Sequence, residues 1–324
     1  MKVLVIHFGQ LGDVILGLPA LDAIRGRFAG AHVTAMTGTP ADQIVRMAGL
    51  ADRVVGIDRW ALKRAPKAKA VGEIARIVRG LRAERYDAVV DLHAFYETGL
   101  MALATGAKLR VGPKRENRSF PFAYTVATPE DRSIHFIDRY LAVAAAAGAP
   151  ARTLEPRITP SPEDDREAGR RLAEVGFVEA PVVGLNPGAG WEIRKWPEER
   201  FVALGRALVD EGARVVVFAG PEEPGLGHEI AGRIGDGAAG VEGLTLGQLA
   251  AAMRRCALVV SNDTGPSHIA ASVGAPTIAL MPGNAGPSAC AVRGERCRLI
   301  YGETIRAIEV DEVLAAAREA LQLL

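Results

Sequence analysis

Residues 2–13 read KVLVIHFGQLGD. The stretch begins with an apolar run that ends at Phe8, continues through two closely spaced glycines, and reaches Asp13 at the start of a helical pattern. A strand, a tight turn and a helix in this order are typical of a parallel sheet covered by helices. Because the glycines interrupt the apolar run before it reaches the length of a signal-peptide core, we interpret it as the first strand of a cytoplasmic protein.

The same alternation continues along the chain, where short β-branched runs are separated by longer stretches with helical periodicity. In the first half the predicted strands are Val3–Phe8, His32–Met36, Arg53–Ile57, Tyr86–Leu92 and Leu109–Gly112, and the predicted helices include Asp13–Phe28, Gly72–Arg85 and Ser133–Ala147. In the second half the predicted strands are Val182–Leu185, Arg214–Phe218, Leu258–Ser261 and Thr277–Leu280, with helices that include Glu198–Glu211 and Leu246–Arg255. This pattern predicts the α/β class.

A proline-rich stretch separates the two halves, with prolines at positions 150, 156, 160 and 162. The length of 324 residues is also more than twice that of a typical domain. We therefore predict two doubly wound, Rossmann-like domains, residues 1–155 and 156–309, that face each other across a cleft with the ligand site. The last helix, residues 310–324, is expected to pack back onto the first domain.

Composition excludes several classes of protein. Lys and Arg (39) nearly balance Asp and Glu (38), and the formal net charge of +1 argues against a nucleic-acid-binding protein. No segment approaches the roughly 20 apolar residues that span a bilayer. Cys256, Cys290 and Cys297 have neither metal-ligand spacing nor the pattern of a disulfide framework, so we predict no metal site.

Asp13 is the first candidate for chemistry. It follows the turn after the first strand, and this turn lacks the G-x-G-x-x-G spacing of a dinucleotide site. Two interpretations of Asp13 stay open at this point. It can cap the helix that begins here, or it can act as a general base at the carboxyl edge of the sheet, where ligands bind.

Three loops of the second half could bind an anionic nucleotide. The glycine-rich loop after Val182–Leu185 carries the cations Arg194 and Lys195, which suit a phosphate but could also be solvated. The segment Ser261–His268 enters a helix whose N–H groups, with nearby hydroxyls, can hold a diphosphate. Glu222 and Glu223 follow another strand, where an acid can accept ribose hydroxyls or simply lie on a surface turn.

Five cations crowd into one short segment of the first half, namely Arg59, Lys63, Arg64, Lys67 and Lys69. The segment shows little periodicity, so a solvated loop is one interpretation. The other is that this loop, together with Lys114, Arg115 and Arg118, meets an anionic, lipid-linked saccharide at a membrane surface.

Together these segments resemble glycosyltransferase family 9, the heptosyltransferases of lipopolysaccharide assembly. The resemblance extends over nearly the whole chain. It is carried, in order, by Gln10-Leu11-Gly12-Asp13, Asp91-Leu92-His93, Asn186-Pro187-Gly188-Ala189 with the basic pair before Trp196-Pro197, Gly220-Pro221-Glu222-Glu223, and Asp263-Thr264-Gly265-Pro266-Ser267-His268. Each motif alone is weakly specific, whereas five in the same order are strong evidence.

The resemblance implies a GT-B fold, with the acceptor bound by the N-terminal domain and the donor by the C-terminal one. It implies inverting transfer from ADP-heptose without a metal or other cofactor. Asp13 is then the general base, and Arg194 and Lys195 are the catalytic cations. The implied donor-binding residues are Gly12, Gly188, Glu222, Glu223, Asp263, Thr264, Gly265, Ser267 and His268, and the implied acceptor-binding residues are His7, Gln10, His93, Arg64 and Lys67.

Departures from the family pattern leave alternatives open. Arg194 stands where the family usually has lysine, and His7 stands where the first strand often ends in arginine. His93-Ala94 replaces a segment with glycine and basic residues, so the acceptor can differ from the inner-core sugar. The alternatives are another nucleotide-sugar-dependent GT-B glycosyltransferase, a non-catalytic nucleotide-sugar-binding protein, or a nicotinamide-dependent oxidoreductase. The missing G-x-G-x-x-G argues against the last of these.

Overall fold

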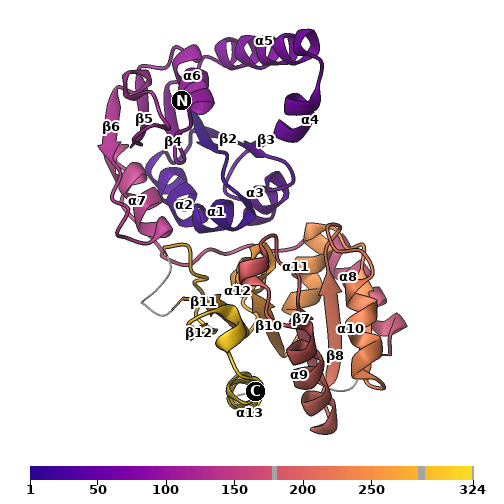
Figure 1. The fold of residues 1–324 in the computed structure, drawn as a ribbon. Coiled ribbons are helices and arrows are strands. Elements are labelled where there is room, and N and C mark those ends of the chain that lie inside the picture. The colour runs from indigo at the N-terminus through magenta and orange to yellow at the C-terminus, as the bar shows by residue number, and fades with distance from the viewer. Residues whose placement is uncertain (177–180, 284–288, 323–324) are drawn as a thin grey trace. The chain divides into compact units, whose positions relative to one another are not determined.

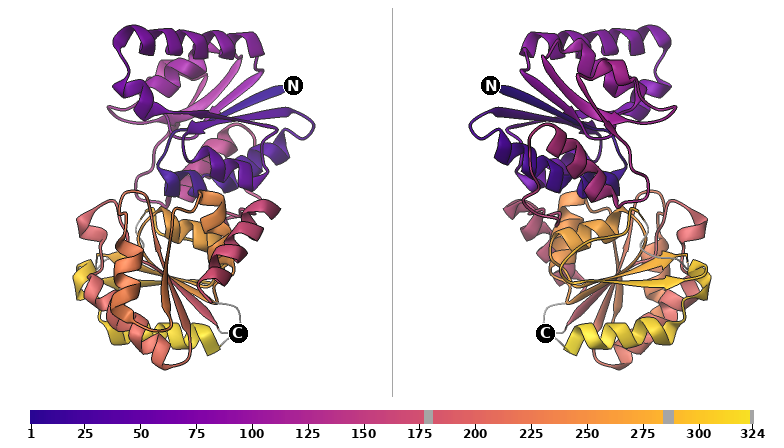
Figure 2. Two further views of the ribbon diagram at one scale, coloured as in Figure 1. Left: turned by 90° about the vertical axis from the view of Figure 1, so that its right-hand side faces the viewer. Right: turned by 90° about the vertical axis from the view of Figure 1, so that its left-hand side faces the viewer.

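The computed structural model describes residues 1–176, 181–283 and 289–322 of the chain. It divides into two compact units, Met1–Pro156 and Arg157–Leu324. Each unit contains a parallel sheet of six strands with helices on both faces (Figures 1 and 2). The predicted doubly wound α/β class is therefore confirmed.

The first sheet has the strand order β3-β2-β1-β4-β5-β6. Its strands are β1 (Lys2–His7), β2 (His32–Gly38), β3 (Arg53–Ile57), β4 (Ala88–Asp91), β5 (Leu109–Lys114) and β6 (Val126–Pro129). Helices α1 (Leu11–Leu16), α2 (Leu18–Arg27), α3 (Asp42–Ala48) and α7 (Phe136–Ala146) cover one face, and α4 (Arg59–Arg64), α5 (Lys67–Glu84), α6 (Tyr96–Ala104) and the 3₁₀ turn η1 (Pro121–Ala123) lie over the other (Figure 1). The central strands β1 and β4 are buried on both sides, which explains their continuous apolar runs.

The second sheet has the order β12-β11-β10-β7-β8-β9. Its strands are β7 (Val182–Asn186), β8 (Arg214–Ala219), β9 (Ala238–Glu242), β10 (Leu258–Asn262), β11 (Thr277–Pro282) and β12 (Cys297–Gly302). The helices are α8 (Pro162–Glu174), α9 (Glu198–Asp210), α10 (Leu226–Ile234), α11 (Leu246–Arg254), α12 (Gly265–Ser272) and α13 (Val310–Gln322), with 3₁₀ turns η2 (Glu192–Arg194) and η3 (Ile305–Ala307).

The two sheets have the same topology, because the second order read from β9 repeats the first order read from β3. In both, the direction of strand succession reverses once, between β1 and β4 and between β7 and β10. Ligands of doubly wound proteins bind outside the carboxyl ends of the strands at such a switch point. Each unit therefore has one preferred place for a site, at the loops that follow these two strands.

The expectation that the last helix packs onto the first domain is wrong. Helix α13 contacts α9, β10 and β11. Its buried residues Val313, Ala316 and Ala317 belong to the same core cluster as Phe201 and Leu204 of α9. The physical reason is proximity, because α13 follows β12 and η3 closely and finds an apolar face of the second sheet to cover. Residues 323–324 of the predicted helix lie outside the described residues.

The secondary structure predicted from the sequence differs from the structure mainly where a helix is interrupted, in the basic segment, and in strands with few buried residues. The predicted helix 13–28 is two helices, because Gly17 ends α1 and a Cβ there would lie 2.9 Å from the His7 ring. The basic segment, expected as a loop, forms α4 and the first turn of α5. Asp58 caps the start of α4, where its side chain accepts the N–H of Ala61. The strands β6, β9 and β12 were missed because their residues are mostly half-buried or exposed, so they lack the buried pattern of the central strands.

Candidate active site

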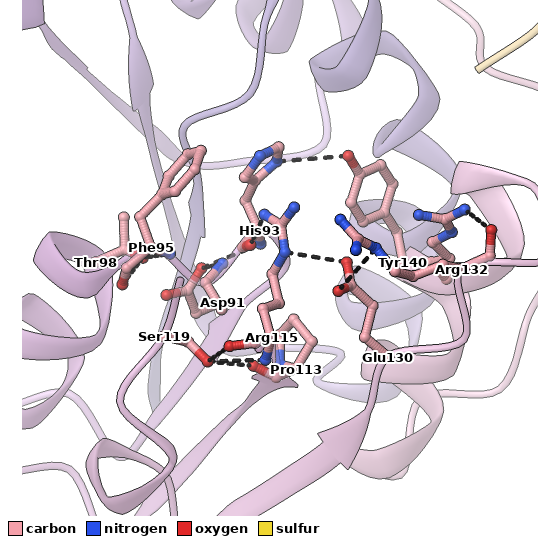
Figure 3. A network of polar contacts seen from close by, with 12 residues as sticks. Asp91, His93, Phe95, Thr98, Pro113, Arg115, Ser119, Glu130, Arg132 and Tyr140 are labelled. Atoms are coloured by element: carbon pink, nitrogen blue, oxygen red, sulfur yellow. Dashed lines mark hydrogen bonds and ion pairs between the residues drawn. The ribbon is translucent and has the colours of Figure 1, made fainter. Parts of the chain in front are cut away.

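The loops after β1 and β4 meet at the switch point of the first sheet. His7 ends β1, and its buried ring lies edge-on to the rings of His93 and Tyr140, with centroid distances of 5.2 and 4.7 Å. Tyr140 belongs to α7, and its hydroxyl lies 3.5 Å from Nδ1 of His93 (Figure 3). The predicted acceptor residues His7 and His93 are thus brought together, but as buried rings.

Both histidines are neutral at pH 7. Burial lowers the pKa of His7 to about 3, and it also holds the pKa of His93 well below its ordinary value. Nδ1 of His7 accepts the backbone N–H of Gly9 at 3.3 Å. A neutral ring that accepts at Nδ1 carries its proton on Nε2. His7 therefore supports the turn that leads from β1 to Asp13.

Asp13 lies in the first turn of α1, where both interpretations made from the sequence meet. Its Oδ2 accepts the N–H of Gln10 at 2.9 Å, so the carboxylate does cap the helix. A Cβ at Gly9 would lie 2.5 Å from Asp13 Cβ, which explains the glycine at that turn. A carboxylate has about four lone-pair sites, so capping and proton acceptance are compatible. Gln10 is exposed and Asp13 is half-buried.

The loop after β4 is held by the buried carboxylate of Asp91. It accepts the N–H groups of His93 and Ala94 at 3.1 and 2.8 Å, and the hydroxyl of Tyr124 at 2.8 Å. Burial raises the pKa of Asp91. Ala94 has a φ of 49°, a left-handed conformation that these hydrogen bonds maintain. Asp91 thus fixes the backbone that carries His93.

Two arginines contact the same loops. Arg115 donates to the His93 carbonyl at 2.8 Å and pairs with Glu130 at 3.0 Å (Figure 3). Arg59 donates to the Phe8 carbonyl at 3.0 Å. The guanidinium groups of both lie over the Phe95 ring, at 5.6 and 5.3 Å from its centroid. The sequence grouped them only with the basic segments, because nothing local shows that β5 and α4 approach β1 and β4.

The predicted acceptor residues Arg64 and Lys67 do not belong to the hydrogen-bonded groups described above for the loops after β1 and β4. Both are exposed, Arg64 at the end of α4 and Lys67 at the start of α5. The guanidinium of Arg64 and the ammonium of Lys63 lie over the exposed ring of Trp60, at 5.8 and 5.7 Å. These residues form an exposed cationic surface on α4 and the start of α5.

In the second unit, asparagines tie the loops after β7 and β10 together. Nδ2 of Asn186 donates to the Ser261 hydroxyl at 3.3 Å. Asn262 donates to the Pro187 carbonyl at 2.6 Å and accepts the N–H of Trp196 at 3.1 Å. Both asparagines belong to sequence motifs, but no local pattern predicts a role for them. Their cross-strand contacts fix the path of the glycine-rich loop.

Three predicted donor segments come together here through ion pairs. Arg194 pairs with Asp263 at 3.1 Å, and Lys195 pairs with Glu223 at 2.6 Å. Glu223 also accepts the N–H of Ala189 at 3.3 Å, and a Cβ at Gly188 would overlap its Oε2. Gly188 is therefore needed for the close approach of Glu223.

The surroundings of Lys195 and Asp263 shift their pKa values. The hydrogen bond that Lys195 donates to Glu223 raises the pKa of Lys195, which keeps its ammonium charged. Burial raises the pKa of Asp263, and the nearby charge of Arg194 opposes that rise. Glu222 is exposed, whereas Glu223 is half-buried and points at the cluster. Glu223 is accordingly the better candidate of the two acids.

Helix α12 begins directly beside Asp263. Thr264 is its N-cap and Gly265 its first residue. The Ser267 hydroxyl donates to the Thr264 carbonyl at 2.6 Å and accepts the Thr264 N–H at 3.3 Å, so it serves the cap. Ser267 and His268 are buried. Gly12, predicted as a donor residue, lies in α1 of the first unit, whereas the other predicted donor residues lie in the second.

The described residues contain neither a candidate metal site nor a candidate membrane-spanning helix. Within 1–176, 181–283 and 289–322, no group of three or more His, Cys, Asp or Glu side chains is placed to hold a metal ion. Over the same ranges, no helix has both the length and the apolar character to cross a membrane.

Known proteins similar to this chain agree on its fold. A glycosyl transferase family 9 structure from Veillonella parvula DSM 2008 superposes with a TM-score of 0.88 at 23% identity, covering 100% of this chain and 97% of that one. An Escherichia coli heptosyltransferase with ADP-2-deoxy-2-fluoro heptose gives a TM-score of 0.79 at 21% identity, covering 98% and 99%. Both likenesses show the GT-B fold.

Sequence comparison identifies the family. Lipopolysaccharide heptosyltransferase 2 of Escherichia coli K12 is 24% identical over 303 residues, which cover 89% of this chain and 83% of that protein. Residues 74–290, more than half of the chain, match the sequence model of glycosyltransferase family 9 (heptosyltransferase). The chain therefore belongs to glycosyltransferase family 9, and it is a glycosyltransferase of the GT-B fold.

Proposed function

We propose that this enzyme transfers a heptose from ADP-heptose to the lipopolysaccharide core or a related lipid-linked saccharide, with inversion at the anomeric carbon. The names of its relatives support heptose and lipopolysaccharide, and the similar structure with ADP-2-deoxy-2-fluoro heptose supports the nucleotide. The family model supports the reaction class.

The observation that carries the proposal is the charged cluster at the switch point of the second sheet. Arg194 and Lys195 offer two cations, and α12 begins beside them. A nucleoside diphosphate needs cations and N–H donors for its phosphates and an acceptor for its ribose hydroxyls, and Glu223 supplies the acceptor. Each of these cations is paired with an acid, Arg194 with Asp263 and Lys195 with Glu223. Binding then exchanges these carboxylates for phosphate oxygens.

The same cluster acts in the chemical step. The acceptor oxygen forms a bond to the anomeric carbon while the bond from that carbon to the phosphate oxygen breaks, so ADP leaves with the bonding electrons. Negative charge grows on the departing phosphate, and Arg194 and Lys195 stabilise it there. The acceptor proton passes to Asp13. A single displacement of this kind inverts the anomeric centre, and we expect it to need no added metal or cofactor.

The acceptor is proposed to bind the first unit, at the loops after β1 and β4. Gln10 is exposed beside Asp13, whereas the buried rings of His7 and His93 shape the floor beneath it. Arg64 and Lys67 supply positive charge for an anionic, lipid-linked saccharide. We place the reaction at the cytoplasmic face of the inner membrane, in peripheral contact with it.

The donor is tested by melting the protein with ADP-, UDP- and GDP-sugars, because a ligand of the native state raises the melting temperature. We expect ADP-heptose to raise it most. Transfer is then followed by mass spectrometry of a heptose-deficient lipopolysaccharide, with and without EDTA. A mass gain of one heptose that persists in EDTA supports the proposal. Stabilisation by ADP-heptose without any transfer would instead favour a non-catalytic binding protein.

A further inference from the structure

Exposed apolar side chains gather on one layer of the first unit. Among the described residues, twelve large apolar side chains are exposed, and seven of them lie on α4, α5, α6 and η1. These seven are Trp60, Val71, Ile74, Tyr96, Leu100, Leu103 and Phe122. We call this set the apolar face. A concentration of this kind on one layer marks an interaction site rather than chance exposure.

The apolar face contains a continuous patch. Tyr96, Leu100 and Leu103 are spaced so that they share one side of α6. The Tyr96 ring lies 4.7 Å from that of Phe120, which in turn lies 5.2 Å from Phe122. Helix α6 therefore continues into η1 as one apolar surface. Helix α5 contacts α6 and extends the same layer (Figure 1).

Burial in the core does not account for most of the apolar side chains of α4 and α5. Helix α4 has no buried residue, and the 18 residues of α5 bury only Ile77 and Leu81. A cavity of about 420 Å³ lies between α4, α5 and the edge of the sheet. Most of the apolar side chains of α4 and the first half of α5 thus add little to the stability of the unit. They are available for another surface.

The segment of chain that carries the apolar face has a large positive charge. Residues 58–124 contain fourteen Lys or Arg and seven Asp or Glu, a net charge of +7. The whole chain has a net charge of +1, so the remaining residues carry −6. Lys63 and Arg64 lie directly over the Trp60 ring. Aromatic rings and aliphatic side chains among cations are what an anionic lipid interface accommodates.

We infer that the apolar face, with the cations around it, docks the enzyme onto an anionic lipid bilayer. Its apolar side chains enter the headgroup region, and Lys63, Arg64 and Lys67 face lipid phosphates. The inference deepens the proposed membrane contact and is independent of the donor. Arg59 of α4 donates to the Phe8 carbonyl, so the docking layer connects to the turn that carries Asp13. A lipid-linked acceptor is thereby presented to the unit that holds the base.

A second copy of this chain is the other occupant to consider. A two-fold contact would place the same surface of both copies face to face. With a net charge of +7 on residues 58–124 of each copy, such a contact brings like charges together. An anionic bilayer is complementary to this charge, whereas a second copy is not.

The test is sedimentation of the full chain with vesicles of phosphatidylethanolamine containing about one third phosphatidylglycerol, compared with phosphatidylcholine vesicles. We expect binding to the anionic vesicles that weakens as salt rises. The variant W60S/L100S/F122S should bind them at least about tenfold more weakly, because binding scales with buried apolar area. L154S/I193S removes exposed apolar side chains elsewhere and should bind like the wild type.

Several results separate the outcomes. The melting-temperature rise with ADP-heptose should be the same in W60S/L100S/F122S and wild type, which shows that the variant is folded. Equal vesicle binding by that variant and the wild type would overturn the docking face. So would a wild-type dimer, measured by light scattering, that becomes monomeric in the variant. Transfer to a detergent-dispersed acceptor without vesicle binding refutes docking alone, and vesicle binding without transfer refutes the proposed reaction alone.

Discussion

At the scale of single residues, Asp13 combines a structural contact with the proposed chemistry. Asn in its place keeps the size and the side-chain oxygen that accepts the Gln10 N–H, but it cannot take a proton. We expect Asp13→Asn to lower kcat by about 100-fold or more with little change in donor affinity. Steady-state kinetics and ADP binding measure the two. Turnover near the wild-type rate would exclude Asp13 as the base.

Arg194 and Lys195 differ in their partners, and so in their expected importance. Arg194 pairs with Asp263 at the start of α12, whereas Lys195 pairs with the proposed ribose acid Glu223. We expect Arg194→Ala to lower kcat by about 100-fold, and Lys195→Ala to lower it less and to raise the donor KM. The double variant should lose both activity and donor binding. The opposite order of the single variants would assign the leaving phosphate to Lys195.

We expect the buried His7 to make the free energy of unfolding depend on pH. Its pKa is about 3 in the folded protein and about 6.5 when exposed, so the unfolded chain binds more protons between these values. The free energy of unfolding therefore falls as the pH drops below about 6.5, and His7 contributes roughly 2 kcal/mol of that loss by pH 5. Denaturant unfolding at pH 7.5 and pH 5 should show a smaller loss for His7→Gln. His32→Gln, at an exposed position, should match the wild type.

At the scale of elements, α4 and α5 replace what the sequence suggested was a loop. Arg64, Lys67 and Lys69 are exposed on them, and exposed charges steer a ligand only over the screening distance, roughly 8 Å at physiological salt. We expect the R64S/K67S/K69S variant to raise the KM of a detergent-dispersed acceptor about tenfold at low salt and to flatten its salt dependence.

The donor KM of that variant should be unchanged, because the proposed donor residues lie in the second unit. R166S/R296S/R298S removes the same charge from exposed positions of the second unit and provides the matched control. If the control alters the acceptor KM as strongly, net charge rather than these helices attracts the acceptor. An acceptor salt dependence equal to that of the wild type would return the segment to a solvated surface.

At the scale of the whole molecule, each unit has a core of its own. One core cluster gathers β7, β8, β10 and β11 with α9, α10 and α13, and another gathers β1 and β4 with residues of α5 and α6. A ligand that binds native protein suppresses the opening of the part that it contacts. We expect ADP to slow amide hydrogen exchange in β7 and β10 by about tenfold or more, with β1 and β4 unaffected. Protection of β1 and β4 alone would move the donor to the first unit.

Sequence alone determined the α/β class, the central strands of both sheets and the loops that carry the candidate residues. These follow from interactions within a few residues. A continuous apolar run such as Val3–Ile6 predicts a strand buried on both faces, and Asp13 at the start of a helical pattern predicts a helix cap, which it forms with the N–H of Gln10. The strand β6 could not be predicted from the sequence, because its exposed and half-exposed residues form no continuous apolar run.

Only the tertiary structure decided which of these residues meet. The pairing of Lys195 with Glu223, the contact of His7 with His93 and Tyr140, and the position of α13 on the second sheet join residues far apart in the chain. Such contacts depend on strand order and on which face each helix covers, and residue spacing does not encode either. The exposed apolar side chains of α4, α5 and α6 could not be predicted from the sequence for the same reason, because side-chain exposure is a property of the packed unit.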